Sequence, residues 1–513
     1  MPPATLPQAT QQHRSMAVAE ASGAQPRAAE TRRGFIEAPL TVVAGLLSTY
    51  FVVAACSLYW LTLAGGALLA KVVPRSLIER APLVWLCGST VLMSAATQTV
   101  PGFFPDYANP GEIVAEIVLW IALGLFARAY LVYTDYPATF DGLKASIETR
   151  PLERWIAGHL HNPIDAIFTR IWVANSVALI PLTLLLILPS TINYFVIVAL
   201  SVAMLLAQFP HEVADHTNIH TRIFQPKIGA APRVKLGLRA LQLYFENVLS
   251  MLVARTPYFY SAQHLFVHHA EGNGPNDSQS TEPYDRTSFL DFSRHAFRQG
   301  VHLVTGVAVC RHLWSKGKNA AARDLIRGLA AWYAIVAVIA SFNPVAALVL
   351  FLSRFLGGNV QSLVAFWQHG LVDPDESEHT RGNTVDFAGA EHGNLGNDYH
   401  VEHHDQPGRH WSKYYELFSR QAKAVGGHPA VVFQKETFAP LAFVAALWRK
   451  DYATLAAAAH VSGMEGLDRA AIEAEIIGRT APIGTPPRTG LAAAIDDRWS
   501  RLMALAMPVR FSV

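Results

Sequence analysis

Cysteine and charge are both scarce in this chain of 513 residues. Its three cysteines, Cys56, Cys87 and Cys310, form no CxxC pair and are too few for a four-cysteine iron–sulfur cluster; they suggest no disulfide framework. Charged residues make up 16% of the sequence, whereas an ordinary soluble domain has about 25%. The formal net charge of +2 indicates no strongly acidic or basic partner, and no nucleic acid is expected as a ligand.

Hydrophobic residues, in contrast, form 51% of the chain and occur in long runs. About 20 apolar residues span the hydrocarbon of a bilayer, so these runs predict membrane helices. The run Leu40 to Ala70 carries no charge and is long enough to cross once or twice. Two further runs follow before residue 134, at residues 81–100 and from residue 112 to about Tyr133.

Two later pairs of apolar runs predict transmembrane hairpins. The first pair, residues 171–189 and 191–210, encloses the turn signal Leu188-Pro189-Ser190. The second pair, residues 325–341 and 345–367, encloses Asn343-Pro344, and it contains Arg327 and Arg354. An intramembrane arginine is costly, so Arg354 is expected either to have a buried partner or substrate group or to extend to the interface.

The basic residues between these runs orient the protein. Cytoplasmic loops carry an excess of Lys and Arg, which places residues 134–170 and 211–323 on the cytoplasmic side. The expected fold class is all-α, a polytopic membrane helical bundle with a cytoplasmic histidine-rich cap. The expected divisions are a disordered tail at 1–38, N-terminal transmembrane helices at 39–134, a metal-binding domain with both hairpins at 135–420, and a cytoplasmic amphipathic extension at 421–513, in which residues 433–449 and 491–506 are interfacial helix candidates.

Histidine is the residue in excess, with 21 copies, most of them in a few dense groups. Two groups directly follow the predicted hairpins, and all are bordered by polar sequence. The candidate metal ligands are His211, His216, His264, His268, His269, His369, His400, His403 and His404. Isolated histidines such as His295, His302, His312 and His460 are better explained as interfacial residues. His220, His379, His392 and His410 lie near the groups but are not expected as ligands.

The spacing of the candidate ligands is compatible with metal binding. His264 and His268 are four residues apart and would share one helix face. His400 lies three and four residues before His403 and His404, so all three could converge. His211 and His216 are five apart, which requires a helix end or a bulge.

Neutral imidazole suits iron, copper, nickel or zinc, and nine imidazoles fit two metals better than one. A ligating histidine usually donates its second N–H to a carboxylate or a carbonyl. Acidic residues adjoin every box and are the expected partners, although some of them could instead be ligands: Glu212, Asp215, Glu271, Glu402 and Asp405.

The three boxes, HX4H, HX3HH and HX2HH, resemble those of the membrane fatty acid desaturase superfamily, which includes acyl desaturases and alkane 1-monooxygenase-type hydroxylases. The resemblance covers roughly residues 170–415. Gln368-His369-Gly370-Leu371 is similar to the additional histidine motif of the alkane hydroxylases. Tyr399 to His404, followed by Pro407-Gly408 and His410-Trp411, is similar to the end of a desaturase. The first box is one residue longer than is usual in the alkane hydroxylases.

The resemblance implies two iron ions (Fe2+) held by the boxes, which use O2 to desaturate or hydroxylate an acyl chain or another lipid-like substrate. No catalytic side chain is expected beyond the metal ligands. The chain has no four-cysteine motif, no GxGxxG after a strand and no haem-domain signature, so a separate ferredoxin, rubredoxin or cytochrome is expected as electron donor. The expected location is the cell inner membrane, with multiple spans and the boxes facing the cytoplasm.

A metal-ion transporter or metal-binding membrane protein is the alternative from another class. Transporters place ionisable ligands near mid-bilayer, within broken helices. Here the boxes lie outside the apolar runs and have acidic neighbours, which favours a catalytic site on one face of the membrane.

Overall fold

The computed structural model of the protein describes most of the chain after residue 135. Within the described residues the protein is mostly helical, in agreement with the expected class, and it also contains one small sheet. The predictions for residues 1–38 and for the second and third apolar runs lie outside the described residues. Those residues are 39–53, 136–188, 194–375, 377, 380–421, 430–434, 440–461 and 466–507.

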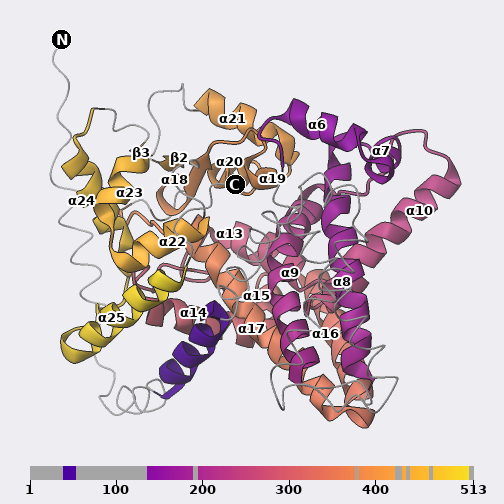
Figure 1. Cartoon of the computed structure of the whole chain (residues 1–513). Helices are drawn as coiled ribbons and strands as arrows, with labels where there is room; N and C mark the ends of the chain where they lie inside the picture. Colours follow the sequence, from indigo (N-terminus) through magenta and orange to yellow (C-terminus); the bar gives the residue numbers. More distant parts are fainter. Residues whose placement is uncertain are drawn as a thin grey trace, which may run out of the picture.

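Two hairpins of long apolar helices occupy the positions that the sequence predicts. The first consists of α8 (Thr169–Ile187) and α9 (Tyr194–Thr221), and the second of α16 (Asn319–Phe342) and α17 (Pro344–Gln368). Figure 1 shows the four helices side by side, extending away from a cap of shorter elements. In the described part of the chain, three stretches are long and apolar enough to cross a membrane: Pro163–Ile187, Asn319–Phe342 and Pro344–Gln368.

Asn343 joins the two hairpins at the end remote from the cap. Its side chain accepts a hydrogen bond from the Ala346 N–H at 3.1 Å and so caps α17. The same amide donates to the carbonyls of Leu186 (3.0 Å) and Ile187 (3.1 Å), at the end of α8. One buried side chain therefore satisfies backbone groups of both hairpins.

A close crossing of α14 (Phe289–Thr305) and α17 fixes the second hairpin against the cap. The two helices meet at Gly300 and Gly358, which allow their backbones to touch. A Cβ atom at Gly358 would lie 2.3 Å from the Ala296 carbonyl oxygen and 2.4 Å from the Gly300 nitrogen. Because neither backbone can retreat without separating the helices, this contact requires glycine.

Arg354 of α17 is fully buried. Its guanidinium donates to the Leu303 carbonyl in the last turn of α14, with an Nε–O distance of 2.9 Å, and lies 4.2 Å from the centre of the Trp332 ring. The negative end of α14 and the face of the indole both stabilise a cation. The sequence left open whether Arg354 has a buried partner or extends to the membrane interface, and the structure shows a buried partner.

A three-stranded sheet, which the sequence did not predict, supports the cap. It contains β1 (Val385–Ala388), β2 (Val431–Gln434) and β3 (Ala459–Val461), with β1 parallel to β2 and β2 antiparallel to β3. Helix α22 (Pro440–Arg449) lies in the adjoining core, where residues 442–448 are at most 3% exposed. The prediction of an interfacial helix at residues 433–449 is therefore wrong, because its apolar side chains pack inward. In α25 (Gly490–Ala506), by contrast, Leu491 and Leu505 are largely exposed.

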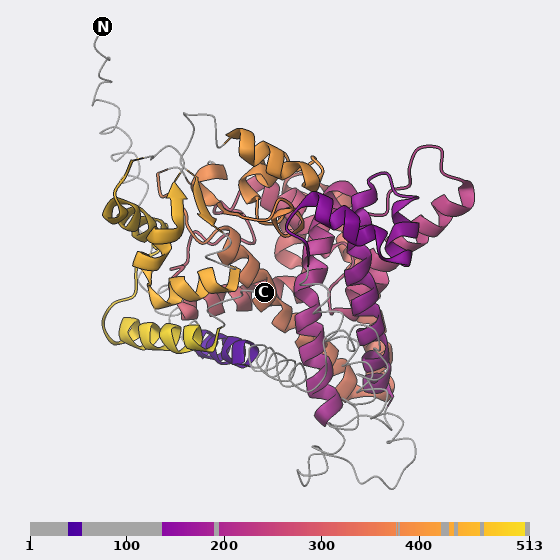
Figure 2. The same cartoon turned by 45° about the horizontal axis from the view of Figure 1, so that its top comes forward.

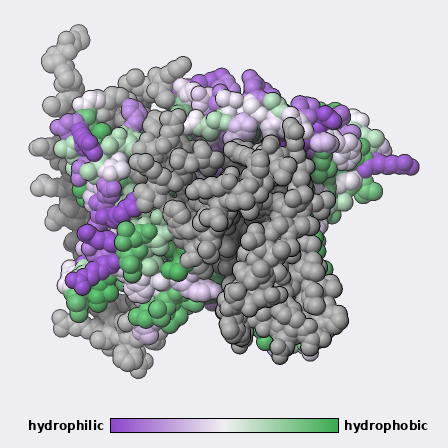
Figure 3. Space-filling model, viewed as in Figure 1, coloured by the Kyte–Doolittle hydropathy of each residue, from purple (hydrophilic) through white to green (hydrophobic). Residues whose placement is uncertain are grey.

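The remaining elements form the cap and its margins (Figure 2). In Figure 3 the described surface is hydrophilic along the top, and hydrophobic patches lie lower, around α25. The other helices are Pro39–Val53, α6 (Phe140–Glu148), α7 (Pro151–Ala157), η1 (Pro163–Phe168), α10 (Pro232–Leu243), η2 (Tyr244–Leu249), α11 (Ser250–Leu252), α12 (Phe259–Gln263), η3 (His264–His268), α13 (His269–Glu271), α15 (Val307–Ser315), α18 (Thr380–Asn383), α19 (Gly393–Gly396), α20 (His400–Asp405), η4 (Trp411–Lys413), α21 (Tyr414–Gln421), α23 (Tyr452–Ala458), α24 (Arg469–Thr480) and α25 (Gly490–Ala506).

The role of Asn343 can be measured by unfolding the full chain in detergent. Asn343→Ala removes the helix cap and both bonds to α8, so we expect a loss of about 2 kcal/mol in the free energy of unfolding. Asn343→Ser keeps a capping oxygen and loses only the bonds to α8, so its loss should be roughly half as large. Equal stability of wild type and Asn343→Ala would show that the contact does not hold the hairpins together.

Candidate metal centre

The first candidate ligands come from the last two turns of α9. His216 and His220 are four residues apart, so both side chains lie on the same face of the helix. His211, five residues before His216, points elsewhere. Its Nε2 lies 3.1 Å from the Ser250 hydroxyl, and its ring packs on Phe245. The helix contains no bulge that would bring the rings of His211 and His216 together.

The second box adopts a π-helical turn, η3 (His264–His268). Its defining bond runs from the backbone N–H of His269 to the carbonyl of His264, five residues earlier. This wider turn brings the Nε2 atoms of His264 and His269 to 3.1 Å. The centres of the His264 and His268 rings lie 5.1 Å apart, so the two are neighbours as predicted, but the Nε2 atom of His268 approaches a different set of histidines.

The remaining ligands come from the end of α17 and from α20. His369 is the C-cap of α17, directly after the second hairpin. In α20, the rings of His400 and His404 meet with their Nε2 atoms 3.1 Å apart, while His403 turns to the other side. The third box therefore contributes to both sets, as the second box does.

Nine imidazoles thus gather into two sets, within each of which the possible ligand atoms lie within 4.8 Å of one another. The two sets include eight of the nine predicted ligands, without His211 and with His220 added. The first group is His216, His220, His264, His269 and His403; the second group is His268, His369, His400 and His404.

The nitrogens of the first group are too crowded to satisfy one another. The Nε2 atom of His403 lies 2.9 Å from that of His216, 2.9 Å from that of His269 and 3.5 Å from that of His264. One ring nitrogen has either one proton or one lone pair and cannot serve three partners. The Nε2 atom of His220 is buried without any hydrogen-bond partner among the described residues.

A shared cation resolves this crowding. Imidazole nitrogens bind a metal at about 2.1 Å, and two ligands at right angles around it are then roughly 3 Å apart. In the second group the Nε2 atoms of His400 and His369 are 3.0 Å apart and those of His369 and His268 are 3.3 Å apart. The residues of both groups therefore fit a metal ion.

The electrostatics also favour metal binding. Burial lowers the pKa of His369 to about 3 and lowers the pKa of His264, His400 and His403 well below the ordinary value for histidine. These imidazoles are therefore neutral at physiological pH, which is the form that binds metals.

Hydrogen bonds on the far side of the rings orient several of the imidazoles. The Nδ1 atom of His268 lies 2.6 Å from the Asp277 carboxylate, and that of His369 lies 2.7 Å from the Asn383 carbonyl. Each Nδ1 can donate its proton there and leave the Nε2 lone pair free. Burial by itself would raise the pKa of Asp277, but His268 and the Gln279 N–H lower it overall, so the carboxylate stays ionised.

None of the acids next to the boxes has the predicted contact with a ligand imidazole. Glu212 pairs with Arg255, and Glu271 pairs with His312 and Lys316. Burial, assisted by Asp386, raises the pKa of Glu402 to about 10, so this side chain is protonated. The partner of His268 is Asp277, nine residues away, which sequence proximity could not identify.

The other nearby histidines have separate contacts. His392 caps α19, where its Nδ1 accepts from the Leu395 N–H, and His410 lies 3.0 Å from the Asp165 carboxylate. His379 lies outside the described residues. The sequence signal that would have favoured His220 over His211 is the four-residue spacing from His216.

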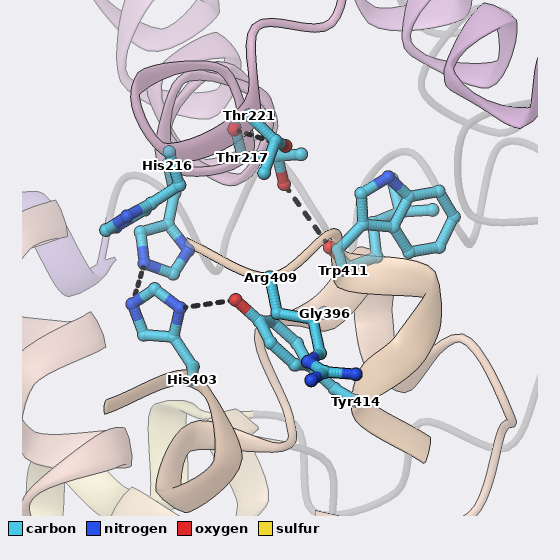
Figure 4. A pocket seen from close by; sticks show the side chains of 10 residues that line it. His216, Thr217, Thr221, Gly396, His403, Arg409, Trp411 and Tyr414 are labelled. Carbon is cyan, nitrogen blue, oxygen red and sulfur yellow. Dashed lines mark hydrogen bonds between the residues drawn. The ribbon is translucent and has the colours of Figure 1, made fainter. Parts of the chain in front are cut away.

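A small pocket opens on the first group (Figure 4). Inside it, the Tyr414 hydroxyl lies 3.1 Å from His403 Nδ1, and the Nε2 atoms of His403 and His216 lie 2.9 Å apart. The pocket thus adjoins three histidines of this group, His216, His220 and His403. Its lining residues are His216, Thr217, His220, Thr221, Leu395, Gly396, His403, Arg409, Trp411 and Tyr414.

Apolar helical hairpins with two sets of imidazoles at their cap ends define a helical protein with two candidate metal-binding sites. A family model described as fatty acid desaturase matches residues 229–435, which contain the second box, His369 and the third box. No curated protein sequence and no solved structure gives a significant match to the chain.

This match supports membership of the membrane fatty acid desaturase superfamily. Membership implies an oxidoreductase that acts on lipid-like substrates, and together with the apolar helices it indicates a membrane protein. The first box lies before the matched residues. His216 and His220 are placed with the matched histidines only by the short distances between their ring nitrogens in the structure.

A pair of substitutions on α9 tests which histidines bind metal. His220→Ala should reduce the metal content of the purified protein by about half, because the first group loses a ligand. His211→Ala should leave the metal content unchanged, although loss of its buried contacts should lower stability by roughly 1–3 kcal/mol. Metal per chain is measured by mass spectrometry. Loss of metal in His211→Ala but not in His220→Ala would show that His211, and not His220, is a ligand.

Asp277 provides a test of the second group. Asp277→Asn removes the anionic partner of His268, so metal affinity at this group should fall about 10- to 100-fold in chelator competition. Asp405→Asn is the matched control, because Asp405 adjoins the third box but is exposed. Equal effects of the two substitutions would mean that the Asp277 bond does not support a metal ligand.

Proposed function

We propose that each histidine group holds one iron ion, so that the protein is an O2-dependent di-iron oxidoreductase that desaturates or hydroxylates a lipid-like chain. The observation that carries the proposal is the convergence of two separate sets of neutral imidazoles, five in one and four in the other. When bound, the irons supply the reduction of O2 and an oxidant strong enough to remove hydrogen from an unactivated C–H bond.

The side chains around the irons prepare the ligands. Asp277 and the Asn383 carbonyl hold the Nδ1 protons of His268 and His369, which keeps both Nε2 atoms available. Six of the nine histidines are buried, which limits the access of water to the space between their rings. The second group has one imidazole fewer than the first and so leaves more positions for O2 or water.

The hairpins provide the route for the substrate. Both groups lie at the ends of helices that continue into the apolar bundle, so a lipid-like chain can reach the irons from the bilayer. Holding one carbon near the metals supplies much of the rate. Whether one oxygen is inserted or a second hydrogen is removed depends on how the neighbouring carbon is held, and product analysis distinguishes the two.

The electrons come from a separate ferredoxin, rubredoxin or cytochrome. The basic residues around the boxes support a cytoplasmic site in the inner membrane. A metal transporter would require ligands in the middle of its spans. Here the histidines follow the apolar part of α9 and α17, which favours catalysis over transport.

The proposal is tested by expressing the full chain with a matched electron donor and analysing the lipid products. His403→Ala and His268→Ala each damage one group, so each should lose about half of the iron and reduce turnover at least 100-fold. Mössbauer spectroscopy of the wild type, purified without oxygen, should show a coupled iron pair. A wild-type protein that holds exchangeable zinc or manganese and oxidises no lipid would contradict the proposal and favour transport.

A further inference from the structure

Two buried glutamines on the helices that lead to the metal centre have no hydrogen-bond partner. Gln208 in α9 and Gln361 in α17 are each 1% exposed. The Oε1 and Nε2 atoms of both amides have no partner among the described residues. Buried amides are almost always paired, because an unpaired one loses its bonds to water without compensation.

The two amides occupy corresponding places on the two hairpins. Gln208 precedes His216 of the first group by eight residues, and Gln361 precedes His369 of the second group by eight. At about 1.5 Å per residue, each lies roughly 12 Å along its helix from the metal centre. A Cβ atom at Gly357 would be 2.7 Å from Gln208 Oε1, so this amide lies against α17 one turn from Gln361. Both amides therefore belong to the seam between α9 and α17.

Three other buried polar side chains near this seam each have at least one hydrogen-bond partner, whereas neither amide has any. Gln299 donates to the Ser278 carbonyl at 2.6 Å and accepts from Gln263 at 3.2 Å. Gln368, one heptad after Gln361, donates to the Asn397 carbonyl. Arg354, one heptad before it, donates to Leu303. Polar side chains one heptad on either side of Gln361 therefore have a hydrogen bond, although Arg354 Nη1 has none among the described residues.

We propose that Gln208 and Gln361 bind an uncharged oxygen group, a hydroxyl or a carbonyl, carried by the lipid-like substrate about two helical turns from its reacting carbon. An amide offers both a donor and an acceptor, which matches a hydroxyl best. A plain hydrocarbon would leave all four amide atoms unpaired, and a site built for hydrogen bonding discriminates strongly against such a ligand. This inference rests on the proposed oxidation of a lipid-like chain, and it narrows the substrate to an oxygenated one.

Thermal unfolding of the full chain without substrate gives the first test. Gln208→Leu and Gln361→Leu remove unpaired amides from an apolar seam, so each should raise Tm. Gln299→Leu, which breaks two existing bonds, is the matched control and should lower Tm. If both seam variants lower Tm as much as the control, the amides have a structural partner such as water, and the proposal fails.

Ligand binding gives the second test, with dodecane and 1-dodecanol as probes in metal-loaded protein. The wild type should bind the alcohol at least tenfold more tightly, and this preference should fall to about equal binding in Gln208→Leu and Gln361→Leu. Equal affinity in the wild type, or a preference that survives both substitutions, would overturn the assignment. Iron content and the iron-pair spectrum should be unchanged in both variants, so a failure here is distinct from a failure of the di-iron proposal.

Discussion

The crowding of imidazole nitrogens is the constraint on which the rest of the structure depends. In each group, ring nitrogens approach to about 3 Å and cannot satisfy one another by hydrogen bonding. Only a cation between them compensates this arrangement. Burial adds to the constraint, because it lowers the pKa of the rings and keeps them neutral. The surrounding fold must therefore keep histidines from distant parts of the sequence close together, although their ring nitrogens cannot satisfy one another.

The fold meets this requirement by ending its long helices at the metal centre. His220 lies in the last turn of α9, and His369 caps α17. The position of α17 is fixed at mid-length by the Gly300–Gly358 crossing and at its far end by Asn343. A helix held at two such points places its last residue accurately, because a regular helix transmits position along its axis.

The sequence predicted the two hairpins and eight of the nine grouped histidines, because long apolar runs and dense histidine boxes depend only on local composition. The sequence did not predict features that depend on tertiary geometry. The exchange of His211 for His220 and the separation of His264 from His268 depend on whether a given turn is α or π. The partnership of Asp277 with His268 arises from a loop fold, and the short sheet strands carry too few residues to show a periodicity.

The histidine groups and the α9–α17 seam would have different roles, and this difference can explain how one superfamily can both hydroxylate and desaturate. In the proposed di-iron centre, the imidazole sets would determine how strong an oxidant is generated, and nothing in their arrangement selects one carbon of a chain over the next. That selection requires contacts with the substrate away from the metals, since orientation and not ligand chemistry decides which bond is reached. The α9–α17 seam lies where such contacts would act, and Gln208 and Gln361 are buried amides there for which the described residues supply no partner. Substrate and regiochemistry can then diverge through the seam while the metal ligands stay unchanged.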